Sequence, residues 1–313
     1  MNTRTKLVNT VIVLGALFAL PAVAPAQDVT IEGGNTDFPD ETLVMPFSAI
    51  GRTTFFSISN VGEGAIDARW VFYDKSGQRI DEVVRFIWGE GGTDVVDVTS
   101  IRDRSIDGEG RFVEGPARSL AGFEGFVVVI GNNEPRLIGN FTMANLSTNS
   151  AFGVNATGFG VLGTVRQGGI ILGTSFNPAT LQDDLLVILA LDVFQNNDAT
   201  IVTSLTNGNA PPVEPLFNVN IVLTGNDPNN SIIAETTVGV TGSALFTTWQ
   251  ALFPGVTLNS SMSIWVSATE GPGLRNGGFD PDDDDGVGII GYYGQAVGPF
   301  GAGQTLRAGT FFQ

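Results

Sequence analysis

Residues 217–223, FNVNIVL, hold the pattern that decides the fold class. An apolar side chain stands at every second position, and Asn218 and Asn220 fill two of the places between. Because side chains alternate between the two faces of a strand, this period predicts a strand with one face on a core and the other in water. Residues 68–73, ARWVFY, alternate in a similar way, and residues 126–130, FVVVI, form the continuous apolar run of a fully buried strand.

Most of the chain follows this example. Its apolar runs are rich in Val, Ile, Phe and Thr, and 41 glycines and 15 prolines interrupt them at the short spacing of a β-sandwich. Helical spacing of leucines occurs in residues 181–194, LQDDLLVILALDVF. We favour a strand there, because the stretch aligns with residues 43–47, which contain Pro46. The sequence therefore predicts an all-β protein.

A weak internal repeat divides the chain in two. Residues 53–60, TTFFSISN, match residues 200–207, TIVTSLTN, and four further pairs of segments lie in the same order at similar offsets. These pairs are 40–44 with 183–187, 68–73 with 217–223, 137–141 with 289–293, and 152–153 with 300–301. We therefore predict two tandem β-sandwich domains related by internal duplication, at residues 27–165 and 181–313. Residues 166–180, RQGGIILGTSFNPAT, form a linker or an edge strand between them.

The two copies differ at two insertions. The first copy carries residues 102–118, RDRSIDGEGRFVEGPAR, and the second expands a hairpin over residues 270–288. Binding sites commonly lie on such loops, where a rigid scaffold supports them.

A strand ending in SISN or SLTN, followed by a strand rich in Trp or Phe and a turn such as Asp74–Gly77, resembles immunoglobulin-like surface domains. The resemblance implies a sandwich architecture. It implies no particular function, because one fold serves many functions.

The first 26 residues have the features of a secretory signal peptide. Arg4 and Lys6 precede an apolar run, VIVLGALFAL at residues 11–20, which is followed by the small-residue stretch Ala24–Ala26. A retained membrane anchor is the alternative, but a spanning helix needs about 20 apolar residues. We predict cleavage after Ala26 and export to the periplasm, the cell surface or the medium, with no membrane-spanning segment in the mature chain.

Composition excludes several classes of function. The chain has no cysteine, so disulfides, thiol nucleophiles and thiolate metal sites are absent, and it has no histidine for a Ser-His-Asp triad or a histidine-ligated zinc site. Removing Arg4 and Lys6 from the 15 basic residues leaves 13 against 32 acidic ones, a net charge of −19. Nucleic acid is therefore not an expected partner, since it requires a basic surface.

The densest charge is the segment FDPDDDDGVG. A calcium ion could bind among its aspartates in a loose loop site, and a solvated acidic loop is the alternative. Counted from the first aspartate, the sixth and twelfth positions hold Asp285 and Gly291 instead of the glycine and glutamate of a helix-loop-helix calcium motif. The possible ligands are Asp280, Asp282, Asp283, Asp284 and Asp285.

Aromatic side chains supply a second candidate site. Trp70, Trp249 and Trp265 lie in apolar stretches and are expected in the core. Trp88 stands beside Gly89 and an acidic turn, so we predict that it is exposed and available to stack on a ligand such as a sugar.

These observations predict a secreted or cell-surface structural or binding protein that is not an enzyme, with self-assembly or stabilisation by calcium as further possibilities. Its partners would be a cell-surface polymer, other surface proteins or copies of itself. One alternative is a carboxylate-dependent hydrolase or lyase acting on polysaccharide, with Asp74, Glu114, Glu124 and Asp192 as candidate residues. Another is an outer-membrane β-barrel, although three tyrosines and irregular turn spacing argue against it.

Overall fold

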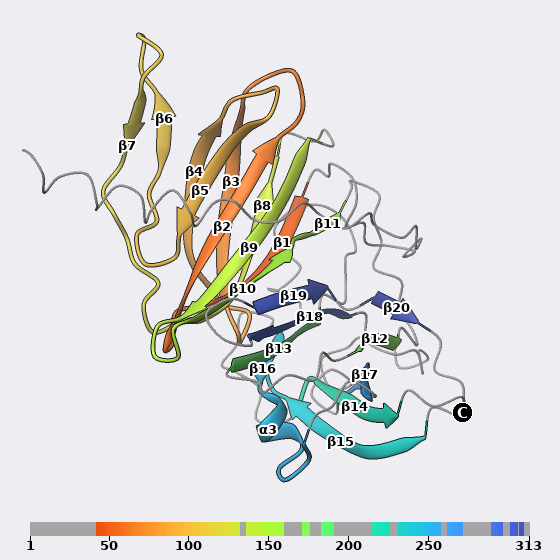
Figure 1. Cartoon of the computed structure of the whole chain (residues 1–313). Coiled ribbons are helices and arrows are strands. Elements are labelled where there is room, and N and C mark those ends of the chain that lie inside the picture. The colour runs from red at the N-terminus through yellow and green to blue at the C-terminus, as the bar shows by residue number, and fades with distance from the viewer. Residues whose placement is uncertain are drawn as a thin grey trace, which may run out of the picture. The chain divides into compact units, whose positions relative to one another are not determined.

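The computed structural model describes residues 42–131, 136–159, 171–175, 183–190, 215–225, 231–257, 262–271, 289–296, 301–305 and 307–309. Strands make up most of these residues and are arranged in four sheets, with almost no helix (Figure 1). The predicted all-β class is confirmed. The predicted signal peptide and residues 200–207 lie outside the described residues. No helix in the described part of the chain is long and apolar enough to cross a membrane.

The first half of the chain forms two sheets. One has the order β11-β1-β8-β3-β4-β6-β7 and the other the order β10-β9-β2-β5. Their strands are β1 (Thr42–Ser48), β2 (Arg52–Asn60), β3 (Ile66–Asp74), β4 (Arg79–Ile87), β5 (Gly92–Asp97), β6 (Arg104–Ile106), β7 (Phe112–Glu114), β8 (Glu124–Ile130), β9 (Leu137–Asn145), β10 (Ser150–Asn155) and β11 (Thr157–Phe159).

The second half also forms two sheets, with the orders β15-β14-β17-β12-β20 and β16-β13-β18-β19. Their elements are β12 (Ile171–Ser175), β13 (Asp183–Ala190), β14 (Phe217–Gly225), β15 (Ile232–Val240), β16 (Ala244–Thr247), α3 (Trp249–Leu252), β17 (Met262–Glu270), β18 (Ile289–Ala296), β19 (Gly301–Thr305) and β20 (Arg307–Gly309). Within the segment predicted as a linker or edge strand, β12 pairs with β17 on one side and β20 on the other.

The two halves have the same strand order. The run β4-β3-β8-β1-β11 matches β15-β14-β17-β12-β20, and β5-β2-β9-β10 matches β16-β13-β18-β19, with every neighbouring pair antiparallel. The expected strand over residues 183–190 is present as β13. Its place in the sheet is that of β2, so strand order does not support aligning residues 183–187 with residues 40–44.

Side chains of β13 divide between two hydrophobic clusters. Leu185, Val187 and Leu189 belong to the cluster of the first half, whereas the side chains of Leu186 and Ile188 belong to that of the second half. A strand buried on both faces reads as a continuous apolar run, which explains why LLVILA shows no alternation in the sequence. The sheet β16-β13-β18-β19 is thus shared by both cores.

Tyr292 of β18 reaches into the first half. Its hydroxyl donates a hydrogen bond to the carbonyl oxygen of Val44 at 2.9 Å and lies 2.7 Å from Oγ1 of Thr157. Its ring packs edge-on against Phe141 with 5.3 Å between centroids. Val44 and Thr157 belong to one sheet and Phe141 to the other, so Tyr292 contacts both sheets of the first half.

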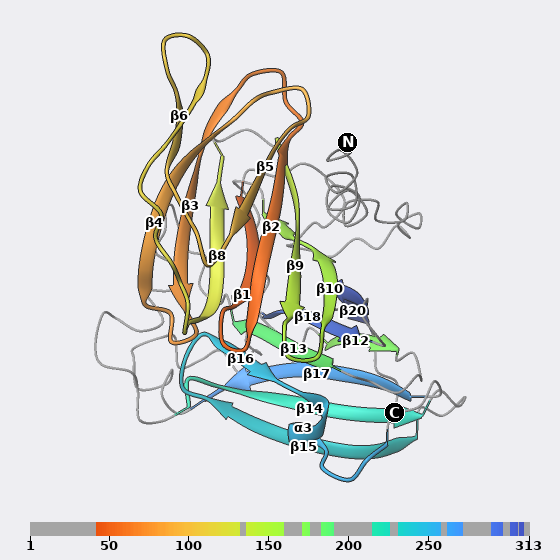
Figure 2. The ribbon, with the colours of Figure 1, turned by 60° about the vertical axis from the view of Figure 1, so that its left-hand side comes forward.

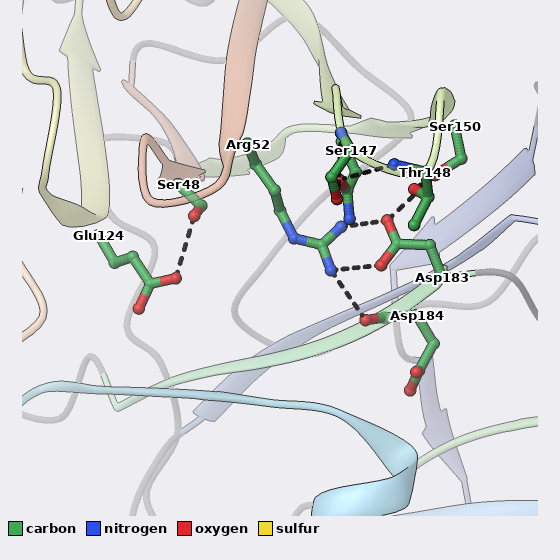
Figure 3. A network of polar contacts seen from close by, with 9 residues as sticks. Ser48, Arg52, Glu124, Ser147, Thr148, Ser150, Asp183 and Asp184 are labelled. Carbon is green, nitrogen blue, oxygen red and sulfur yellow. Dashed lines mark hydrogen bonds and ion pairs between the residues drawn. The ribbon is translucent and has the colours of Figure 1, made fainter.

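A partly buried ion pair also joins the two halves (Figure 3). The guanidinium of Arg52 binds both carboxylate oxygens of Asp183, and its Nη2 also donates to the carbonyl oxygen of Asp184 at 3.2 Å. The carboxylate of Asp184 accepts the backbone N–H of Trp249 at 2.5 Å, which fixes the start of α3. Burial raises the pKa of Asp184, and the bond from Trp249 opposes that rise.

Glycine permits the close approach of the two halves. Gly294 of β18 and Gly303 of β19 stand opposite each other in the ladder. A Cβ added at Gly294 would lie 2.0 Å from the ring of Phe152, and one at Gly303 would lie 2.2 Å from Val154. Both of these neighbours belong to β10. The β10 strand therefore packs against a surface from which side chains are missing.

We predict that Gly294→Ala destabilises the protein by about 1–3 kcal/mol, because the buried Phe152 ring must move to make room for the methyl group. The measurement is urea unfolding followed by tryptophan fluorescence. Gly108→Ala is the control, since a Cβ there meets no atom within 4 Å. Equal stability of both variants would contradict the packing described here.

Candidate binding surface

Asp280, Asp282, Asp283, Asp284 and Asp285 lie outside the described residues. Within the described part of the chain, no group of three or more acidic side chains is placed to hold a metal ion. Calcium binding at the acidic loop stays a prediction.

The candidate catalytic carboxylates of the described residues are engaged in local contacts. Asp74 accepts hydrogen bonds from the backbone N–H groups of Ser76 and Gln78 and so closes a turn. Glu124 accepts the hydroxyl of Ser48 at 3.0 Å, and Glu114 lies 3.8 Å from Arg102. Asp192 lies outside the described residues.

Trp88 is exposed, as its position beside Gly89 suggested. Its side chain keeps 47% of its accessible area. On β4, Val84 and Phe86 stand in phase with Trp88, whereas Val83 and Arg85 are buried on the other face. Alternation along this strand therefore places Phe86 and Trp88 on one side of the sheet.

A tight turn fixes the backbone at Trp88. The N–H groups of Glu90 and Gly91 donate to the carbonyl oxygens of Gly62 and Asn60, at 2.6 and 2.8 Å. Glu90 has a φ of 55° and Gly91 a φ of 91°. The glycine-rich stretch at residues 89–92 is thus a turn anchored to a neighbouring loop, and it holds Trp88 in place.

The insertion at residues 102–118 brings a third ring to the same place. It folds into the β6–β7 hairpin, which extends the sheet beyond β4 (Figure 1). Phe112 of β7 is 49% exposed. The centroid of its ring lies 6.5 Å from that of Phe86, and the centroid of the Phe86 ring lies 4.8 Å from that of Trp88. We call Phe86, Trp88 and Phe112 the aromatic surface. Phe86 and Phe112 were not singled out in the sequence, although the insertion was.

Buried charges hold the hairpin against the two sheets of the first half. The carboxylate of Asp94, which has no exposed area, binds Arg85 at 2.5 and 2.8 Å and Arg104 at 2.7 Å. Asp94 belongs to β5, Arg85 to β4 and Arg104 to β6, so the cluster links the two sheets and the hairpin. Burial lowers the pKa of Arg104 and Asp94 opposes that shift, but a guanidinium keeps its charge in either case.

Arg104 also supports the aromatic surface directly. Its guanidinium lies over the ring of Phe112, 4.4 Å from the centroid. A cation placed over an aromatic face is attracted by the ring quadrupole, so this contact favours one orientation of the ring. The hairpin therefore presents Phe112 from a defined position.

The other tryptophans were predicted to be in the core, and one of them is not. Trp70 and Trp249 are buried, but Trp265 is only half-buried. It stands on β17 in phase with Ser263 and Ser267, opposite Val222 and Gly173, and its Nε1 donates to Thr224 at 2.9 Å. The prediction for Trp265 was wrong because it rested on the hydrophobicity of the surrounding stretch and did not consider which face of the strand Trp265 occupies.

No protein-family model, no curated protein and no solved structure matches this chain.

We predict that Asp94→Asn destabilises the protein by about 3–5 kcal/mol, because Arg85 and Arg104 would stay buried without their counter-charge. Thermal unfolding measures the effect. Trypsin cleavage after the arginines of the insertion should also become faster, since the hairpin loses its anchor. The matched control is Asp67→Asn, an exposed residue of β3 that should change little. Equal melting temperatures of the two variants would show that the cluster does not stabilise the fold.

Proposed function

We propose that this protein is exported and binds a neutral polysaccharide on the aromatic surface. The observation that supports the proposal is the grouping of Phe86, Trp88 and Phe112, of which the last two are about half exposed. Exposed aromatic rings held by strands and a fixed turn can stack on the apolar faces of sugar rings at little cost in side-chain entropy.

The charges around the surface favour an uncharged ligand. Each arginine of the insertion already has an acidic partner: Arg102 with Glu114, Arg104 with Asp94, Arg111 with Asp107 and Glu109, and Arg118 with Asp81 and Asp103. An anionic polymer would have to compete with these carboxylates and would also be repelled by the net negative charge of the chain. A neutral polysaccharide meets neither obstacle.

The proposal includes compartment and architecture. The signal-peptide pattern of residues 1–26 supports export, and the absence of cysteine is compatible with an exterior where packing alone stabilises the fold. We also propose that the two halves are immunoglobulin-like β-sandwiches that arose by duplication. The identical strand order of the paired sheets supports this relation.

We predict that Trp88→Ala and Phe112→Ala each weaken binding to the cognate polysaccharide about tenfold or more, since each removes one stacking face. Phe55→Ala is the matched control, because Phe55 is a similarly exposed ring on β2. The measurement is depletion of the protein by insoluble cellulose, chitin, xylan and mannan, with alginate as the anionic comparison.

Two outcomes would contradict this function. One is the absence of binding to any of the neutral polymers. The other is an equal loss with Phe55→Ala, which would show that binding does not depend on the aromatic surface.

A further inference from the structure

The outer edge of β15 is the open end of a sheet. β15 is the first strand in the order β15-β14-β17-β12-β20, and it pairs with β14 along its length. No other described strand pairs with it, and Figures 1 and 2 show it as the outermost strand of its sheet. Such an edge presents a row of N–H and C=O groups that can pair with another strand.

The same position in the first half is covered. β4 takes the place of β15 in the matching sheet, and the insertion lies along its edge, where β6 pairs with it. The N–H of Val84 donates to Asp103 at 2.9 Å, and the carbonyl oxygen of Phe86 accepts from Arg104 at 3.3 Å. The second half has α3 after β16 in place of this hairpin.

The sequence of β15 lacks the usual protection of an edge strand. Its nine residues, IIAETTVGV, include one charged side chain, Glu235, and no lysine, arginine or proline. Ile232 and Ile233 are 47% and 44% exposed. A shift in register near Ile233 interrupts the ladder at that end, and residues 234–240 continue it without interruption. Long, weakly charged edges of this kind favour pairing between molecules.

We propose that β15 pairs antiparallel with β15 of a second copy of this chain, about a two-fold axis at Thr236. Along an edge strand, every second residue points its N–H and C=O groups outward. In an antiparallel pair, two residues that face each other must both point these groups toward the partner or both point them away. Two identical edges can therefore pair regularly only about a two-fold axis that passes between two copies of the same residue. An axis at Thr236 pairs residues 234–238 of one strand with those of the other, all within the uninterrupted part of the ladder.

The side chains favour this register. It places Thr236 opposite its own copy and Glu235 opposite Thr237 of the second copy, so no like charges face each other across the axis. The hydroxyl of Thr237 already donates to Oδ1 of Asn220 on β14, 3.0 Å away. An axis at Glu235 would instead place two carboxylates opposite each other, which is unfavourable. One strand pair per molecule makes a small interface, so association is weak and depends on concentration.

Opposite charges at Thr237 test the register. Thr237 is exposed on β15, so substitutions there leave the core intact. Thr237→Lys faces Glu235 of the second copy and should tighten the dimer about two- to thirtyfold, because the symmetric interface contains the pair twice. Thr237→Glu should weaken it by a similar factor. Sedimentation velocity of the mature chain from low to high micromolar concentration, at about 0.15 M salt, measures both.

The same charge changes at Ala121, an exposed turn residue of the first half, control for net charge. Melting temperatures of all four variants confirm that they are folded. A monomer at every concentration, or equal dissociation constants for the two Thr237 variants, overturns the proposal. Weakening by both variants overturns the axis at Thr236. The result is independent of polysaccharide binding, because the aromatic surface lies on the other half of the chain.

Discussion

Burial of β13 on both faces is the constraint on which the described structure depends. Its odd-numbered side chains from Leu185 to Leu189 pack into one core, and its even-numbered side chains pack into the other. A polar side chain at either set of positions would leave a buried group without a partner. The sheet that contains β13 can therefore be stable only when the first half covers one face and the sheet led by β15 covers the other.

Polar contacts then select one arrangement at this shared sheet. Hydrophobic contact is non-directional, so the two halves could slide relative to each other without large loss of buried area. The bidentate bond of Arg52 to Asp183 and the hydroxyl of Tyr292 at Val44 satisfy polar groups in one position only. The opposed glycines in β18 and β19 also favour this one position, because β10 can pack closely only where side chains are missing. The relative position of the two halves is therefore set by the geometry of these contacts more than by the apolar area that they bury.

The sequence predicted strands well where one face meets solvent and poorly where neither does. FNVNIVL became β14 with the expected alternation, whereas the run in β13 required comparison with Pro46 to choose strand over helix. That comparison paired it with β1 residues, although its place in the sheet is that of β2, because short apolar segments resemble one another too closely to fix an alignment. For the candidate site, the glycine and acidic turn beside Trp88 indicated that this residue is exposed, but Phe112 reaches Phe86, the neighbour of Trp88, only through the fold of the insertion. No spacing in one sequence reports such a contact.

The matching sheet edges of the two halves differ: one is covered and the other is open among the described residues. In the first half the insertion lies along β4, with Asp94 buried among two guanidinium groups. Desolvating three charges costs free energy that apolar contact would not, so the cluster is a poor device for stability alone. It does hold the hairpin, and with it the exposed ring of Phe112, beside Phe86. The second half lacks that hairpin, and its matching edge keeps backbone groups that can pair with another strand. Under the two proposals above, the first half presents side chains to a ligand and the second presents main-chain groups to another copy of the chain.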